Sequence, residues 1–202
     1  MPAEIAAALP RLRTKAIATL AARTPCPVAT YRTILKSVGE VDLRSGDAEV
    51  VRRRFNSFYG VRRNAEWRAT FYASFEAAKA SQLPPAGLFA KIVQAIHADT
   101  GRVEASFVSK LVATVNPQAP IIDSVVRKWF STVVEPPEFS GDVEVVVGYY
   151  RWLEGVMTEA AATGAGKLWS DEFEAQFPTP TGERPITPVK RLDFLIWAGA
   201  DR

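Results

Sequence analysis

Apolar positions recur every three or four residues along most of this chain, the spacing that places them on one face of an α-helix. Proline, glycine and capping residues divide the pattern into segments. The expected helices cover residues 3–22, 28–36, 47–58, 65–80, 86–98, 104–115, 124–134, 142–162, 170–177 and 189–197. We expect Asp47, Asn64 and Ser170 to cap three of them, with a turn over 39–46, a flexible linker over 163–166 and a proline-rich loop over 178–188.

One segment could be read as a strand. Residues 143–150 are rich in valine and tyrosine, which favour β-structure. The apolar pattern continues through Trp152, Leu153, Val156 and Met157 at helical spacing, and no two-residue alternation flanked by hairpin turns occurs. The sequence therefore predicts a helix here and a single all-α domain over residues 1–202, without internal repeats.

Composition restricts the class of protein. The 202 residues are 48% hydrophobic and 23% charged, values typical of an ordinary globular chain of one domain or two small ones. No apolar run approaches the ~20 residues of a membrane helix, so no spanning segment is expected. The start, Met1-Pro2-Ala3-Glu4, lacks the basic and apolar regions of a secretory signal.

Metal and redox chemistry have few donors in this sequence. Cys26 and His97 are the single residues of their types, which excludes an internal disulfide, cysteine-held zinc or iron–sulfur and a histidine-rich metal site. We expect no cofactor and no metal, and a reducing, cytoplasmic location is the default expectation. The net charge of +3 is compatible with an anionic partner.

A basic and aromatic segment runs from Val51 to Tyr72. It holds six arginines against one glutamate, interleaved with six aromatic residues. Arginine clusters contact nucleic-acid phosphates. Arg62 and Arg63 precede a predicted helix, where backbone amides also favour an anion. The alternative is that the aromatics form core faces and the arginines are the solvated faces of the same helices.

Lys110 and Asp123 are the strongest candidates for chemistry. Lys110 is the one lysine of an otherwise small or apolar helix, and Asp123 opens the next helix after a proline-bounded turn. Two antiparallel helices joined in this way could bring the amine and the carboxylate to one surface. The alternative is structural: Ser106, Lys110 and Thr114 form a polar stripe, and Asp123 is an N-cap.

The segments Ser109-Lys110-Leu111 and Pro120-Ile121-Ile122-Asp123-Ser124-Val125-Val126-Arg127 carry a resemblance. With them the chain resembles a distant member of the helix-hairpin-helix DNA glycosylase superfamily, in particular the small bacterial 8-oxoguanine-glycosylase-like proteins. More broadly, residues 56–59, 62–67 and 192–197 resemble blocks of a widespread family of uncharacterised bacterial proteins. The resemblance implies a helix-hairpin-helix glycosylase-like core over residues 47–162, with the N-terminal helices and the final helix packed around it.

The resemblance also implies base excision on damaged double-stranded DNA. Lys110 would attack C1′ of the damaged nucleoside and form a Schiff base that leads to strand cleavage. Asp123 would stabilise positive charge on the sugar, and Arg62, Arg63 and Arg127 would contact phosphates. Two alternatives stay open: a non-catalytic relative that binds nucleic acid or protein, and a helical protein that binds a small molecule.

Two further groups are expected to have no functional role. Lys190 and Arg191 with Asp193, on the last predicted helix, are expected to form surface ion pairs of small effect. Residues 164–167 resemble a phosphate loop only superficially, because the leading glycine, the following Ser/Thr and the preceding strand are missing.

Overall fold

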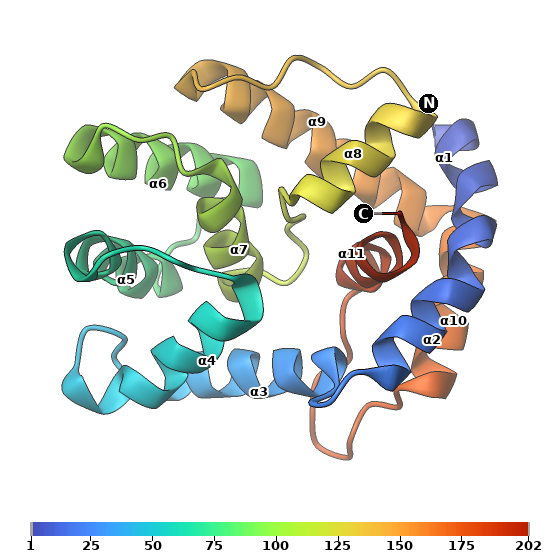
Figure 1. Ribbon diagram of the computed structural model, residues 1–202, viewed down its shortest axis with the longest axis horizontal. Coiled ribbons are helices and arrows are strands. Elements are labelled where there is room, and N and C mark those ends of the chain that lie inside the picture. The colour runs from blue at the N-terminus through green and yellow to red at the C-terminus, as the bar shows by residue number, and fades with distance from the viewer. Residues whose placement is uncertain (1, 202) are drawn as a thin grey trace.

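The computed structural model describes residues 2–201, and every regular element in this range is a helix, which confirms the all-α prediction (Figure 1). The elements are α1 (Pro2–Ala8), the 3-10 turn η1 (Leu9–Leu12), α2 (Arg13–Ala22), α3 (Pro27–Glu40), the 3-10 turn η2 (Gly46–Ala48), α4 (Glu49–Tyr59), α5 (Ala65–Lys79), α6 (Pro85–Thr100), α7 (Ala105–Val115), α8 (Ser124–Val133), α9 (Val143–Ala162), α10 (Gly164–Gln176) and α11 (Pro188–Gly199). None of the helices within residues 2–201 is both long and apolar enough to cross a membrane.

The first expected helix is interrupted. Pro10 lies in η1, which separates α1 from α2, because proline lacks the amide hydrogen that a continuous α-helix needs at that position. Farther on, α3 continues to Glu40 and includes Gly39, which the sequence placed in a turn. Four side chains of α3 at helical spacing are buried, and their burial extends the helix past its expected end: Val28, Tyr31, Ile34 and Val38.

The residues at the helix termini determine where α4 begins and ends and where α5 begins. Asp47 was expected to cap the first of these helices, but it lies in η2, and Ala48 occupies the cap position without a side-chain bond. Gly60 ends α4 with φ of +67°, a left-handed conformation that favours glycine. Asn64 caps α5 as expected, because its side-chain oxygen accepts from the Trp67 amide at 2.9 Å.

The linker expected over residues 163–166 is instead a tight helix junction. Thr163 caps α10, its hydroxyl accepting from the Gly166 amide at 3.1 Å, so the helix begins six residues before the expected Ser170 start. A Cβ on Gly166 would lie 2.3 Å from the Ala160 carbonyl oxygen, so any residue other than glycine would clash at this position. The glycine therefore permits close packing of α10 on the end of α9.

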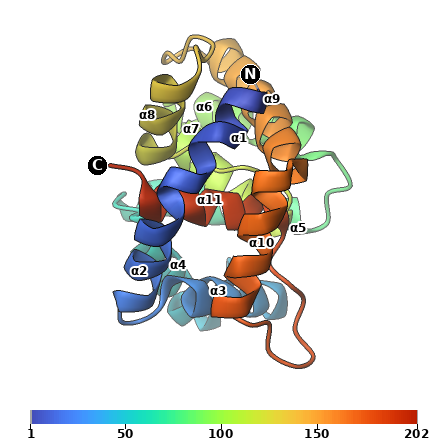
Figure 2. The same cartoon turned by 90° about the vertical axis from the view of Figure 1, so that its right-hand side faces the viewer.

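Helix α11 lies at the centre of the arrangement, with α2 and α10 on either side of it and α8 and α9 also in contact (Figure 2). It is buried nearly all round, so its polar side chains are buried with it: Lys190 is 3%, Arg191 8% and Asp193 6% exposed. The prediction of surface ion pairs on this helix is wrong. The reason is its central position, which a 12-residue segment considered alone does not reveal.

The aromatic residues of the basic segment form core, as one of the two interpretations predicted. Phe55 of α4 packs against Phe71 and Phe75 of α5, and Trp67 stacks on Phe71 with ring centroids 5.0 Å apart. The valine-rich segment is helical, in α9, where its Tyr150 lies in the core. The aromatic contacts with α5 hold α4 in place, and α4 lines the region described next.

Candidate functional site

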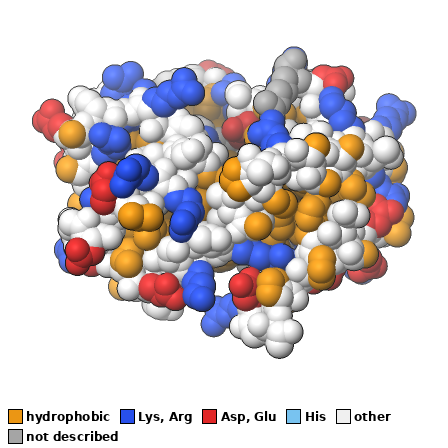
Figure 3. Space-filling view, turned by 60° about the horizontal axis from the view of Figure 1, so that its bottom comes forward, with side chains coloured by type: hydrophobic (Ala, Val, Ile, Leu, Met, Phe, Trp, Pro, Cys, Tyr) orange, Lys and Arg blue, Asp and Glu red, His pale blue; other side chains and the backbone are white. Residues whose placement is uncertain are grey.

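A cleft of about 1380 Å³ opens between two groups of helices. The turn between α2 and α3, helix α3 and helix α4 line one side, while Lys110 of α7, the segment before α8 and helix α11 line the other. Figure 3 shows a face of the molecule on which Lys and Arg side chains are interspersed with visible apolar side chains. The cleft brings together segments more than one hundred residues apart in sequence.

Lys110 projects from α7 into this cleft and is only 7% exposed. Its ammonium nitrogen donates to the Ser106 hydroxyl, one turn earlier on the same helix, at 3.1 Å. It also donates to the Tyr59 backbone carbonyl, near the end of α4, at 3.3 Å. The polar-stripe interpretation therefore describes its local contacts, while its amine lies at the cleft wall.

Asp123 lies on the same side of the cleft as Lys110, at the N-cap of α8. One carboxylate oxygen, Oδ1, accepts from the Val125 amide at 2.8 Å, which satisfies the helix end. The other oxygen, Oδ2, lies 4.0 Å from the Lys110 Nζ. A single carboxylate thus caps a helix with one oxygen and faces the amine with the other, and the sequence-based hypothesis that the two groups approach one another agrees with this geometry.

The segment that carries Asp123 is fixed by its neighbour on α7. The Ile122 amide donates to the Ser109 hydroxyl at 2.9 Å, and this hydroxyl in turn donates to the Ser106 carbonyl. Ile122 is almost completely buried. Because Ser109 directly precedes Lys110, the same turn of α7 positions both the amine and the chain that presents the carboxylate.

Burial lowers the pKa of Lys110 from its ordinary value of 10.5, because desolvation penalises the ammonium form. The Asp123 carboxylate opposes this shift without cancelling it. A lysine must lose its proton before its nitrogen can act as a nucleophile. The net effect is therefore a larger neutral fraction of the amine than an exposed lysine would have at the same pH.

A second lysine–aspartate pair lies in the same cleft. Lys190 and Asp193 are buried and lie one turn apart on α11, with the Lys190 Nζ 2.5 Å from the Asp193 Oδ2. Burial alone would lower the pKa of Lys190, but the charge and hydrogen bond of Asp193, together with Tyr59 and Asp123, outweigh it and raise the pKa. Burial raises the pKa of the Asp193 carboxyl, and the Lys190 ammonium opposes that shift. The sequence identified these residues as an ion pair but placed it on the surface, because their burial comes from the helices packed around α11.

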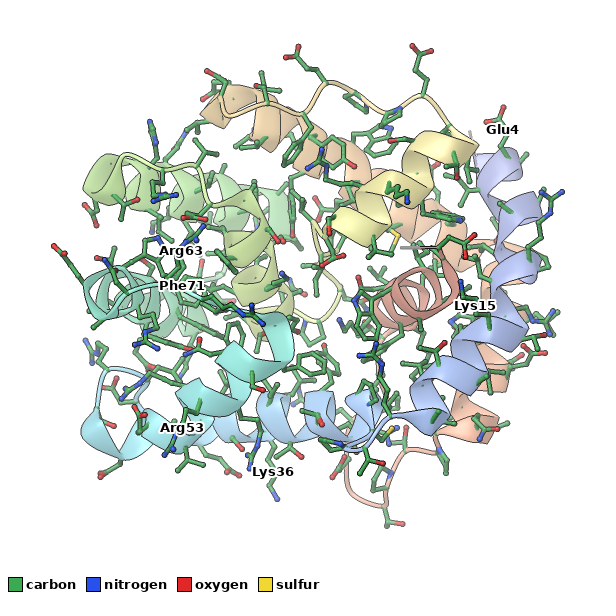
Figure 4. The ribbon with its side chains drawn as sticks, in the orientation of Figure 1. Glu4, Lys15, Lys36, Arg53, Arg63 and Phe71 are labelled. Atoms are coloured by element: carbon green, nitrogen blue, oxygen red, sulfur yellow. The ribbon has the colours of Figure 1, made fainter. Side chains whose placement is uncertain are left out.

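The three expected phosphate-contacting arginines occupy different places. Arg62 is exposed and lines the cleft with Lys110 and Asp123. Arg63 instead makes two hydrogen bonds, of 3.0 and 3.1 Å, to the buried Glu104 carboxylate, and Figure 4 shows it away from the cleft-lining Arg53. The guanidinium carbon of Arg127 lies over the Phe139 ring, 3.7 Å from its centroid. The structure therefore brings together Lys110, Asp123 and Arg62, but neither Arg63 nor Arg127 lines the cleft.

Within residues 2–201, no group of three or more His, Cys, Asp or Glu side chains is arranged to hold a metal ion. Comparison of the chain with protein-family models, curated proteins and solved structures gives no match. The chemistry that bears on function is therefore that of the cleft itself: a partly desolvated amine, a carboxylate at 4.0 Å and a basic rim.

Proposed function

We propose that this chain excises damaged bases from DNA, as a glycosylase with associated lyase activity, and that its α4–α9 region is a helix-hairpin-helix glycosylase-like core. The observation that carries the proposal is the approach of the Lys110 amine to the Asp123 carboxylate at the wall of an open cleft. The two residues come from consecutive helices, α7 and α8, as the resemblance in the segment 109–127 implies.

In the proposed reaction the neutral Lys110 amine attacks C1′ of a nucleoside extruded from the duplex. A bond forms between Nζ and C1′, and the glycosidic bond breaks, its electron pair leaving with the base, which takes up a proton. Nζ then loses a proton, and its lone pair forms the C1′=N bond as the C1′–O4′ bond opens and O4′ takes up a proton, which gives a protonated Schiff base. Removal of a C2′ proton from this species expels the 3′ phosphate and cleaves the strand.

Asp123 has two tasks in this scheme. Its Oδ2 stabilises the positive charge that develops at C1′ as the base departs, an electrostatic effect that is strong where water is excluded. It can also accept, through one bridging water, the proton released as the lysine becomes a nucleophile, because the two groups are 4.0 Å apart. Its other oxygen remains bound to the Val125 amide, which holds the carboxylate in place.

Borohydride trapping tests this proposal directly, because reduction converts the Schiff base into a stable secondary amine. End-labelled duplexes with one abasic site, or one 8-oxoguanine, are incubated with protein and sodium borohydride, and the covalent adduct is resolved on a denaturing gel. We expect an adduct with the wild type and with K128Q, which removes an exposed lysine of α8 outside the cleft. We expect none with K110Q.

Two outcomes would contradict the proposal. An undiminished adduct with K110Q would assign the chemistry to another amine. Absence of any wild-type adduct, while duplex binding persists, would favour the alternative of a non-catalytic nucleic-acid-binding protein. Circular dichroism of each variant establishes that the helical fold is retained before the adducts are compared.

A further inference from the structure

Helix α4 has two functional faces. Val51, Phe55 and Tyr59 face the core and are buried. A second face lines the cleft, and its members recur at intervals of three and four residues: Val50, Arg53, Arg54, Ser57 and Phe58. The core face holds the helix in place, so the cleft face is a fixed surface on which two arginines are adjacent.

The arginine charge in this cleft is not neutralised by the acids that line it. Asp123 and Asp193 are the acidic lining residues, and each already lies beside a lysine. Among the described residues, neither Arg54 nor Arg62 has an acidic side chain within salt-bridge distance. Within residues 2–201, the one acidic contact of Arg53 is Glu49, with Nε 3.5 Å from a carboxylate oxygen, an exposed pair of the kind that contributes little.

Neighbouring arginines show the contrast. Arg52 donates to the carbonyls of Leu43 and Ser45, both at 2.7 Å, and so holds the turn that precedes α4. Arg63 is committed to the buried Glu104. These two side chains have structural partners, whereas the side chains of Arg53, Arg54 and Arg62 are presented to the cleft.

A fourth guanidinium comes from the turn between α2 and α3, on the same side of the cleft as α4. Arg23, at the C-terminal end of α2, lines the cleft and lies over the Trp197 ring at 4.7 Å. Among residues 2–201, no acidic side chain lies within salt-bridge distance of the Arg23 guanidinium. Guanidinium groups bind phosphate in a planar, two-bond geometry, which distinguishes them from the more compact lysine charge.

We infer that Arg23, Arg53, Arg54 and Arg62 form a rim that binds the sugar–phosphate backbone of DNA on the α4 side of the cleft and directs it toward Lys110. The inference rests on the proposed function for the identity of the partner. It differs from the sequence-based hypothesis, because two of the three arginines named there lie outside the cleft and Arg53 and Arg54 replace them.

Salt-dependent binding tests the rim. Fluorescence anisotropy is measured with a labelled duplex that carries a tetrahydrofuran abasic-site analogue, which retains the phosphates but has no C1′ leaving group. We expect R53Q/R54Q to weaken binding by roughly 10- to 100-fold at low salt. The slope of log K against log salt should also decrease in magnitude by about 0.9 for each phosphate that the variant no longer neutralises.

The matched control is R11Q/R151Q, which removes the same charge from two exposed arginines outside the cleft. We expect its affinity and slope to stay close to the wild-type values. Wild-type affinity and slope in R53Q/R54Q would overturn the inference, even if borohydride trapping succeeds. Binding of polyglutamate but not of duplex would also overturn it, and would indicate an acidic protein partner.

The two proposals can fail separately. If the wild type gives no borohydride adduct but R53Q/R54Q loses duplex binding relative to R11Q/R151Q, the rim stands and the catalytic assignment falls. If trapping depends on Lys110 while the rim variants bind normally, the catalytic assignment stands and the DNA path lies elsewhere on the molecule.

Discussion

The two lysine–aspartate pairs of the cleft consist of the same residue types but differ in construction. Lys190 and Asp193 lie on one helix, one turn apart, and are 2.5 Å apart with almost no exposure. Lys110 and Asp123 come from two helices, are 4.0 Å apart, and the aspartate side chain keeps 21% of its surface exposed. The pKa of Lys190 is raised and that of Lys110 is lowered.

The difference shows how separation decides the state of a buried lysine. At hydrogen-bond distance the carboxylate compensates the loss of water around the ammonium, and the pair is a structural element. At 4.0 Å the compensation is incomplete, and the amine is held in a state that loses its proton more easily. The first arrangement stabilises the fold, and the second suits a nucleophile.

The largest expected effect is on stability, from K190M. Removing the ammonium leaves the Asp193 carboxylate buried without its partner, so we expect a loss of about 3–5 kcal/mol in the free energy of unfolding. Urea denaturation measures it. The double variant K190M/D193L removes both charges and should recover most of the loss, and a loss below ~1 kcal/mol in K190M would contradict the structural role of this pair.

An intermediate effect is expected at Asp123, where two functions can be separated. D123A removes the N-cap acceptor of α8 and should cost ~1 kcal/mol, whereas D123N keeps an oxygen for the Val125 amide and should be nearly as stable as the wild type. Both variants remove the charge that raises the pKa of Lys110, so borohydride trapping by D123N should reach its maximum at lower pH. Equal destabilisation by the two variants would contradict the capping contact.

The smallest expected effect is the pH-dependent stability difference between the wild type and K110M. The pKa of Lys110 lies below 10.5 in the folded protein, so between these two values the unfolded chain binds more protons. Wild-type stability should therefore rise relative to K110M as the pH increases toward 10.5. At pH 7 we expect K110M to be within ~1 kcal/mol of the wild type.

Urea unfolding of both proteins at several pH values between 7 and 10 measures this difference. The tyrosines are the same in both proteins, so their titration contributes equally to the two free energies of unfolding and cancels in the difference. The Lys190–Asp193 pair gives the opposite sign, because the pKa of Lys190 is raised. Its contribution is present below 10.5 and is lost as the pH rises through the folded value. A wild-type advantage over K110M that falls with pH would contradict the lowered pKa of Lys110.

The sequence could predict one of these pairs because its geometry is local. The helix that carries Lys110, the proline-bounded turn and the helix that opens at Asp123 are consecutive, so a hairpin brings the two residues together. Lys190 and Asp193 have the i, i+3 spacing that is usual on exposed helices. Their burial depends on α2, α8, α9 and α10 surrounding α11, which no local pattern contains.

The same distinction applies to the arginines of residues 52–54. Their sequence neighbourhood is shared, yet Arg52 holds a turn through two carbonyls while Arg53 and Arg54 line the cleft. Helical spacing predicts that consecutive residues face different directions, but the identity of the neighbour on each side comes from the tertiary arrangement. The Ser170 cap was mispredicted for a related reason, because Gly166 permits a close helix junction that flexible-linker composition conceals.

The central position of α11 determines when, during chain synthesis, the cleft can form. The rim and the Lys110 wall lie within residues 23–123, whereas the second lysine pair belongs to residues 190–193. During synthesis on a ribosome the basic wall emerges first, and the cleft is complete only when α11 docks between α2 and α10. A chain shortened before residue 188 would therefore present its arginines without the pocket they surround.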